Sequence, residues 1–330
     1  MKPMRCWINL SCAVVIAMAA GLPAQAQDYP SKAVTIISPA AAGNSTDIAT
    51  RLIAERLTQI WKQQVVVLNR AGAGGLLAAQ AAAGADKDGY TLYMSVSSTW
   101  TVLPVMQEGK IPFDMQKAFV PIAMGGQQPI ALAVNTNVPA KNVAELIELA
   151  NKTPGGLLYA TSGRGGVSHL CGELLRARAK VNLSFVHSPG VATGLNDVIA
   201  GRIPIAFEGI AAQRAATESG AIRLLATAAP KRLPNLPDVP TIAETVPGVV
   251  AVGWLALMGP AGIPDSIVRK VAADMKTVLA NPEVIEKFDV LGTYPVDMGP
   301  EQLFEYMRAE EQLWWPIVRE VNREQAATPR

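Results

Sequence analysis

The chain has 330 residues, of which 50% are hydrophobic, and a formal net charge of +2. This length provides material for one large core or two of ordinary size. The near-neutral balance gives no reason to expect nucleic acid or an anionic membrane as a partner.

The first 26 residues have the pattern of an export signal. Lys2 and Arg5 precede a short apolar run, and Ala24-Gln25-Ala26 forms a small-residue cleavage pattern. We therefore expect a signal peptide at 1–26 and a periplasmic location; the alternative is an uncleaved anchor, for which the apolar run is short. The mature chain would carry 27 basic and 27 acidic residues, with Cys171 as its one cysteine, which excludes an internal disulfide.

Strand and helix patterns alternate along the chain. Apolar runs at 33–38, 64–69 and 90–97 predict strands, and helical periodicity follows the first two from residues 45 and 76. This β-α-β-α-β order predicts a parallel sheet covered by helices.

A second alternating set begins near residue 129, and one late strand near residue 253 precedes the final helices. The pattern predicts two α/β lobes, each a mainly parallel sheet flanked by helices, with lobe 1 at 27–130 and 251–330 and lobe 2 at 131–250. Ligands of such sheets bind beyond the carboxyl ends of strands, here in a crevice between the lobes. In the last helix, Trp314 and Trp315 are expected to contact a core, and Pro316 to kink or end it.

Catalytic and cofactor motifs fail on their spacing. The run "AGAGGLL" departs from G-x-G-x-x-G because Leu77 occupies the sixth position. Ser168 and His169 are adjacent on a predicted helix, where neighbouring side chains point apart, and Leu170 breaks G-x-S-x-G. The two histidines lack paired metal-ligand spacing. We expect no enzyme activity, no cofactor and no metal.

Three predicted helix starts are instead rich in hydrogen-bond donors. They lie at 41–47, 97–100 and 162–169. Free amides at a helix N-terminus, aided by the helix dipole, bind anions. The alternative is plain capping, with Asn44 or Ser45 as N-cap and Asp47 as an ordinary first-turn acid.

The same stretches resemble the Bug-type (TctC-like) periplasmic receptors of tripartite tricarboxylate transporters. The matching segments, in family order across the mature chain, are "YPSKAVTII", "GNSTDIATRL", "VVVLNRAGAGG", "DKDGYTLYM", "VPAKNVAELI", "VSHLCGELL", "LNDVIAGRIPIAF", "LPDVPTIAE" and "MGPAGIP". The resemblance implies a two-lobed type II periplasmic-binding-protein (Venus flytrap) fold that closes on a small carboxylate.

The ligand-binding residues expected from this resemblance and its departures are Ala42, Gly43, Asn44, Ser45, Thr46, Asp47, Ser97, Ser98, Thr99, Trp100, Ser162, Gly163, Val167, Ser168, His169 and Glu208. Trp100 is expected near the cleft mouth, where it would stack on an aromatic acid or simply pack. Glu208 stands where the family usually has Asp; it would contact the ligand or bridge the lobes, or be an ordinary paired surface acid.

Two departures concern ligand preference. Ala40-Ala41-Ala42-Gly43-Asn44 replaces the family's Phe-Pro-Pro-Gly-Gly, and His187-Ser188-Pro189-Gly190 replaces Pro-Tyr-Lys-Gly. The ligand is therefore left open between aliphatic and aromatic mono- or dicarboxylates.

These features favour a monomeric periplasmic solute-binding protein that delivers a small carboxylate to the permease subunits of a tripartite tricarboxylate-type transporter. The alternative is a periplasmic sensor that acts on a membrane histidine kinase. A secreted hydrolase using Ser168 is a third hypothesis, which the motif failure disfavours.

Overall fold

The computed structural model describes residues 29–161, 163, 165–188 and 190–327, without the side chains of 324–327. The expected signal peptide lies outside the described residues. The compact unit that begins at Lys32 contains all the strands and helices discussed below.

The first sheet segment is parallel, as the alternation predicts. Strand β1 (Val34–Ser38) lies between β2 (Val65–Asn69) and β3 (Thr91–Val96) and is parallel to both. Helices α2 (Ser45–Trp61) and α3 (Leu76–Ala83) connect them. Strand β9 (Val252–Pro260) then pairs antiparallel with β3, so the late return strand joins this segment.

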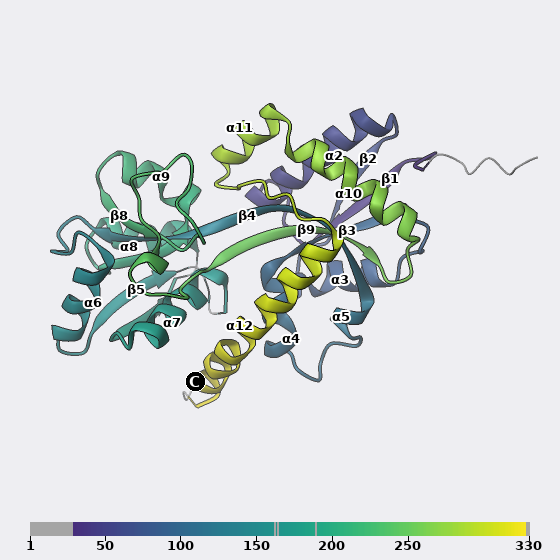
Figure 1. Ribbon diagram of the computed structural model, residues 1–330. Coiled ribbons are helices and arrows are strands. Elements are labelled where there is room, and N and C mark those ends of the chain that lie inside the picture. The colour runs from purple at the N-terminus through teal and green to yellow at the C-terminus, as the bar shows by residue number, and fades with distance from the viewer. Residues whose placement is uncertain (1–28, 162, 164, 189, 328–330) are drawn as a thin grey trace, which may run out of the picture. The chain divides into compact units, whose positions relative to one another are not determined.

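A single long strand, β4 (Phe119–Asn135), links two groups of strands. Its residues from Phe119 to Pro129 pair with β9, whereas Ile130–Val134 pair with β7 (Ile205–Gly209) on one side and Ala131–Asn135 with β8 (Ile222–Thr227) on the other. We use "lobe 1" for the strands β1, β2, β3, β9 and the first part of β4, and "lobe 2" for β5 to β8 and the second part of β4 (Figure 1). The lobe boundaries expected from the sequence stay a prediction.

Lobe 2 repeats the same α/β construction. Strand β5 (Leu157–Thr161) is parallel to β6 (Leu183–His187) and β7, and the full order is β2-β1-β3-β9-β4-β7-β5-β6, with β8 on β4. Its helices are α6 (Val143–Lys152), α7 (Val167–Ala179), α8 (Val191–Ile199) and α9 (Ile210–Glu218). The two-lobed α/β class with helix-flanked sheets is confirmed, but the strands are mixed in direction and not mainly parallel, because β9 pairs antiparallel with β3 and β4 pairs antiparallel with β7, β8 and β9.

The remaining helical elements lie mostly beside lobe 1. They are η1 (Ala73–Gly75), η2 (Ser98–Val102), α4 (Leu103–Met106), α5 (Met115–Ala118), η3 (Ile242–Glu244), α10 (Asp265–Leu279), α11 (Pro282–Val290) and α12 (Pro300–Ala327). Helix α12 does not end at Pro316. Because Trp314 and Val318, on either side of that proline, are both buried, core packing holds the helix together there.

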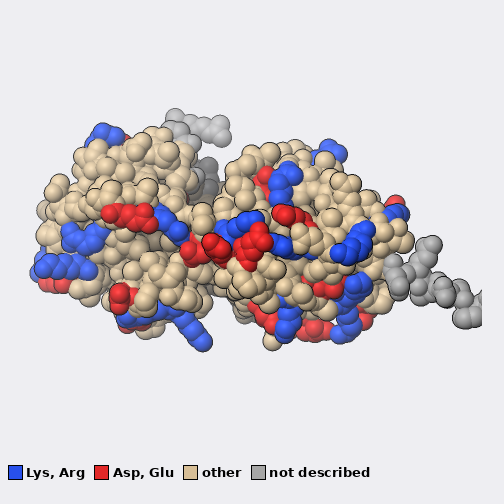
Figure 2. Space-filling model, turned by 90° about the horizontal axis from the view of Figure 1, so that it is seen from above, with Lys and Arg blue, Asp and Glu red and all other residues tan. Residues whose placement is uncertain are grey.

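Two features of the described part of the chain are the hydropathy of its helices and the charge of its surface. None of the helices there is long and apolar enough to cross a membrane. Figure 2 shows acidic and basic side chains interspersed over the face in view, with neither sign dominating it. This charge distribution agrees with the near-neutral composition.

Candidate functional site

A cavity of about 350 Å³ is lined by residues of both lobes. It includes the carboxyl ends of β3 and β7, at Val96 and Gly209, which is where open α/β sheets bind ligands. Its described lining residues are Ser45, Thr46, Val96, Ser97, Ser98, Gln128, Ile130, Val167, Val191, Glu208, Gly209, Ile210, Ala211, Ala212, Gly253, Trp254, Leu291 and Gly292.

The turn before α2 is organised around the carboxylate of Asp47, which is 2% exposed. Its Oδ2 accepts hydrogen bonds from the Gly43 amide at 2.9 Å and Arg51 Nε at 3.0 Å, and its Oδ1 accepts one from Asn69 Nδ2 at 2.7 Å. Burial by itself would raise the pKa of Asp47, but the hydrogen bonds from Arg51, Asn69 and Gly43 outweigh burial and lower it. Asp47 is therefore committed to holding the turn.

Asn44 is the N-cap of α2. Its Oδ1 accepts a hydrogen bond from the Asp47 amide at 2.8 Å, which satisfies one of the donors that an anion would otherwise use. The capping alternative thus applies to Asn44 and Asp47. Ser45 and Thr46 line the cavity, whereas Ala42, Gly43, Asn44 and Asp47 are not among its lining residues.

The end of β3 divides into cavity residues and packing residues. Ser97 and Ser98 line the cavity. Thr99 is fully buried, and its Oγ1 donates to the Gly74 carbonyl at 3.0 Å. Thr99 therefore holds the glycine turn of η1 against η2.

Trp100 lies in the core of lobe 1, whereas we expected it near the mouth of the cleft. Its side chain is 4% exposed, packs in the cluster that contains Tyr93 and Met307, and donates through Nε1 to Glu311 Oε1 at 2.9 Å. The helical backbone from Ser97 onward turns this side chain toward α12. The packing alternative therefore describes Trp100.

The buried side chain of His169 contacts the loop before α7. The imidazole is 1% exposed, its Nδ1 accepts a hydrogen bond from the Gly165 amide at 3.0 Å, and its ring lies 4.2 Å from that of Phe185 between centroids. Val167 lines the cavity, Gly163 is half-buried, and Ser162 lies outside the described residues. His169 thus positions the loop without lining the cavity.

Glu208 is the charged side chain among the described lining residues. It is 5% exposed, and its Oε2 accepts a hydrogen bond from Ser168 Oγ at 3.3 Å. Glu208 therefore links the carboxyl end of β7 to the first turn of α7 at the wall of the cavity.

Three helices of lobe 2 begin at the cavity without a side-chain cap. Their N-caps are Gly166 for α7, Gly190 for α8 and Gly209 for α9, and none of the three makes a side-chain capping bond. First-turn residues of all three, including Val167 and Val191, line the cavity. By contrast, α6, which does not line the cavity, is capped by Asn142 Oδ1 on the Glu145 amide at 2.9 Å. At these three starts no N-cap side chain competes with an anion for the first-turn amides.

Sequence reasoning missed the residues that lobe 1 contributes from β4 and β9. Gln128 and Trp254 line the cavity, and Trp254 is 1% exposed, with Nε1 donating to Glu310 Oε2 at 3.2 Å. Burial raises the pKa of Glu310 to about 7, although bonds from Trp254 and Trp314 oppose this rise. The sequence cue was the apolar return strand that contains Gly253 and Trp254, and such a strand predicts a core equally well.

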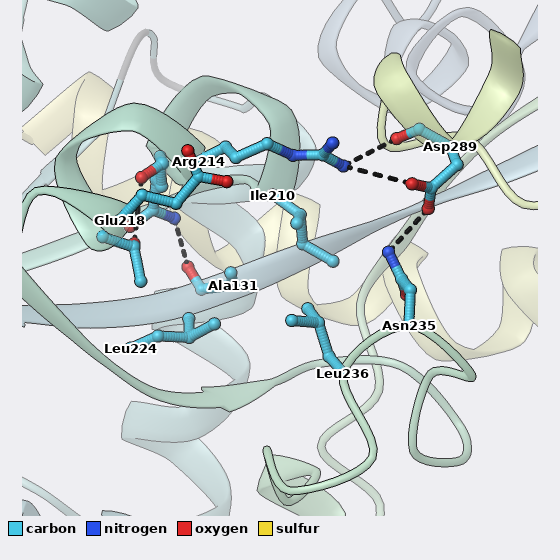
Figure 3. A pocket seen from close by; sticks show the side chains of 10 residues that line it. Ala131, Ile210, Arg214, Glu218, Leu224, Asn235, Leu236 and Asp289 are labelled. Carbon is cyan, nitrogen blue, oxygen red and sulfur yellow. Dashed lines mark hydrogen bonds and ion pairs between the residues drawn. The ribbon is translucent and has the colours of Figure 1, made fainter. Parts of the chain in front are cut away.

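A second, smaller cavity of about 240 Å³ lies at α9, and Figure 3 shows it from close by. There the Arg214 side chain of α9 reaches Asp289 at the end of α11, donating to its carbonyl at 2.7 Å, and Asn235 Nδ2 donates to Asp289 Oδ1 at 2.6 Å. At Gly292 (φ +61) a Cβ would lie 3.0 Å from the Ala211 amide nitrogen, so this glycine permits close approach to the start of α9. The end of α11 and the turn that follows it thus contact α9.

Reactive groups in and near the cavity are engaged in structural contacts. Ser168 donates to Glu208 and His169 accepts from Gly165, so the two side chains have different partners. Cys171 is fully buried, and burial raises the pKa of its thiol, which disfavours the reactive thiolate. Within the described part of the chain, no cluster of three or more His, Cys, Asp or Glu side chains could hold a metal ion.

Comparisons with known proteins agree on one family. The family model described as "Tripartite tricarboxylate transporter family receptor" matches residues 49–323. The protein BugT of Bordetella pertussis is 32% identical over 301 residues, which cover 91% of this chain and 92% of BugT.

Two solved structures of similar proteins cover nearly the whole of their chains when compared with this one. A protein of R. palustris solved with adipate is 30% identical, with a TM-score of 0.74 and coverage of 89% of this chain and 98% of that one. MatC from Rhodopseudomonas palustris, solved with bound malate, is 29% identical, with a TM-score of 0.70 and coverage of 88% and 100%.

Proposed function

Because the chain belongs to the family of tripartite tricarboxylate transporter receptors, we propose that it captures a small organic carboxylate in the 350 Å³ cavity and delivers it to the permease of such a transporter. The observation that carries the proposal is the meeting of three glycine-capped helix starts at one cavity. Oriented amides stabilise an anion without any side-chain cation.

The proposed contacts divide between the lobes. Lobe 2 supplies amides of the first turns of α7, α8 and α9, and lobe 1 supplies hydroxyls. The hydroxyl residues are Ser45, Thr46, Ser97 and Ser98. A ligand that bridges both sets would stabilise the closed arrangement of the lobes relative to the open one.

The relatives support the ligand class. Two similar proteins were solved with adipate and with malate, both of which are carboxylates. The serine and threonine residues that line the cavity, together with apolar lining residues such as Trp254, suit an acid with a short apolar body. Export through cleavage of residues 1–26 is part of the same proposal.

Calorimetry with a panel of carboxylates tests this function. The protein is first unfolded and refolded to remove any ligand that it carries, and native mass spectrometry of the untreated protein identifies such a ligand. We expect one-to-one binding of at least one acid by the refolded protein. Binding of no acid, although refolding restores the native circular-dichroism spectrum, would contradict the proposal.

Uptake by a deletion strain tests delivery to a permease. Loss of uptake of the identified acid is expected if the protein serves transport. Normal uptake together with a changed transcriptional response to the acid would instead identify a sensor.

A further inference from the structure

The second cavity, of about 240 Å³, has a buried amide in its wall that lacks one partner. Gln213 lines this cavity and is 1% exposed. Its Nε2 donates to the Glu208 carbonyl and to the Ala131 carbonyl, both at 2.9 Å, so both N–H groups are used. Its Oε1 is buried and accepts no hydrogen bond from the described residues. Because buried acceptors in folded proteins are nearly always satisfied, this oxygen indicates a donor that those residues do not supply.

The orientation of the Gln213 amide follows from its partners. Both partners of Nε2 are carbonyl oxygens, which only accept, so exchanging the amide nitrogen and oxygen would lose both hydrogen bonds. The end of the amide that lacks a partner is therefore the acceptor.

The other polar donors of this lining make contacts inside the protein. Arg214 Nη2 donates to the Asp289 carbonyl at 2.7 Å and lies 3.7 Å from Asp289 Oδ2. Thr217 Oγ1 donates to the Gln213 carbonyl at 2.9 Å, and Asn235 Nδ2 donates to Asp289 Oδ1 at 2.6 Å. These contacts place the cation and the two neutral donors on groups of the protein itself.

The unbalanced charge at this cavity is acidic. Glu218 lies exposed at the end of α9, lines the cavity and makes no ion pair with the part of the chain that the structure describes. The Asp289 carboxylate is balanced by Arg214. A free acceptor and a negative charge therefore line the cavity, which disfavours a carboxylate and favours a cation that donates hydrogen bonds.

The rest of the lining is apolar. Figure 3 shows the side chains of Ile210, Leu224 and Leu236 around the same space as Arg214 and Glu218. Leu224 and Leu236 are half-buried, so a ligand in the cavity can cover apolar surface that water now contacts. A short alkyl chain complements these side chains.

We propose that this cavity is a second ligand site, which takes a small primary ammonium with a short alkyl chain. The ammonium donates to Gln213 Oε1 and to the Glu218 carboxylate, and the alkyl chain packs on Leu224 and Leu236. The site is separate from the carboxylate cavity, although Ile210 lines both. This inference goes beyond the proposed function and does not depend on it.

Methyl NMR of the protein tests this site with three probes. Butylammonium has the chain, the charge and the donors, butan-1-ol has the chain without the charge, and tetramethylammonium has the charge without a donor. We expect butylammonium to shift the methyl signals of Leu224 and Leu236 saturably, with a dissociation constant on the order of 1 mM, and the other two probes to bind at least about fivefold more weakly. Equal binding of the three probes, or no shift at the two leucines, overturns the inference. Shifts confined to Val167 and Val191 of the carboxylate cavity also overturn it.

Variants then assign the binding to this cavity. Leu236→Trp fills the cavity from a half-buried position and should weaken butylammonium binding at least about tenfold. Leu158→Trp, exposed on β5 and lining neither cavity, is the matched control and should bind as the wild type does. Glu218→Gln removes an exposed charge and should weaken binding about threefold, whereas Glu305→Gln should not. Wild-type affinity in a folded Leu236→Trp protein, or in Glu218→Gln if the tryptophan variant does not fold, would contradict the site.

Discussion

At the cavity, helix α2 of lobe 1 and helices α7, α8 and α9 of lobe 2 differ in how their first-turn donors are used. In lobe 1, Asn44 caps α2 and Asp47 binds the amide of Gly43, so the turn satisfies its own backbone. In lobe 2, glycine stands at the caps of α7, α8 and α9, and none of these caps makes a side-chain capping bond. The same local element is therefore capped by its own side chains at α2, and we propose that it binds the anion at α7, α8 and α9.

This difference follows from the residue at one position. A short polar side chain at the N-cap accepts from the first-turn amides, whereas glycine has no atom that can do so. A ligand can supply the missing acceptor at the three glycine-capped helices of lobe 2. In lobe 1, α2 keeps its side-chain cap, and the hydroxyls of Ser45 and Thr46 in its first turn line the cavity.

The largest loss of ligand affinity is expected from a carboxylate placed at one of the glycine-capped helix starts. Ala212→Asp adds a negative charge in the first turn of α9, where acids stabilise helices, but inside the cavity. We expect unchanged or higher thermal stability and a loss of ligand affinity of about 100-fold, because like charges in contact cost several kcal/mol. Ala215→Asp, exposed on the same helix outside the cavity lining, is the control and should bind normally by calorimetry.

The next largest effect should come from the turn in lobe 1. Asp47→Ala leaves the Gly43 amide, Arg51 and Asn69 without their shared acceptor, so we expect the free energy of unfolding to fall by about 3 kcal/mol. Urea unfolding of ligand-free protein measures this loss. Asp265→Ala, which removes an exposed ion pair with Arg269, should cost less than about 0.5 kcal/mol. A collapse of affinity with unchanged ligand-free stability would identify Asp47 as a ligand contact and not a structural acid.

A smaller effect concerns Glu310 on α12 and the dependence of stability on pH. Because the pKa of Glu310 is raised from 4.5 to about 7, the protonated side chain is favoured in the folded state. Its contribution to stability is fully present below pH 4.5 and is lost as the pH rises to about 7. Between these pH values the free energy of unfolding should fall by about 2 kcal/mol more in the wild type than in Glu310→Gln.

Urea titrations at a series of pH values measure this difference. Glu305→Gln, exposed on the same helix, should follow the wild-type pH profile. Parallel profiles for wild type and Glu310→Gln would contradict the assignment of the effect to Glu310.

The smallest effect transfers the cap of lobe 1 to lobe 2. Gly209→Asn introduces the residue that caps α2, and a Cβ at Gly209 would meet no atom within 4 Å. We expect α9 to gain only a few tenths of a kcal/mol of stability while ligand affinity falls about fivefold, since the side chain now occupies an amide. Gly209→Ala adds the Cβ without an acceptor and should change affinity less. Equal affinities for the asparagine and alanine variants would show that the amides of α9 do not bind the ligand.

The strand and helix order could be predicted from the sequence because periodicity and length report burial directly. The length of β4 could not. Pro121, Gly125 and Pro129 suggest loop, yet β4 includes all three, and irregular register between Pro121 and Gly126 accommodates the first two against β9. The chain crosses between the lobes within this strand, so the missed residues are the ones that join the two sheets.

The candidate site was predictable as a set of loops but not residue by residue. Ser45 and Asp47 are two positions apart, and only the fold determines that the first lines the cavity while the second turns inward to Arg51. Trp100 turns into the core because the helical backbone after β3 sets its direction. Trp254 was missed because a buried strand residue has the same sequence pattern whether it lines a cavity or fills a core.

A crystal structure with the tightest-binding carboxylate tests the central claim most directly. We expect the carboxylate oxygens to lie about 2.7–3.1 Å from first-turn amide nitrogens of α7, α8 or α9, with hydroxyls of lobe 1 completing the contacts. A carboxylate bound instead by the amides of 41–44 in lobe 1, with the three glycine-capped helix starts facing water, would contradict the account.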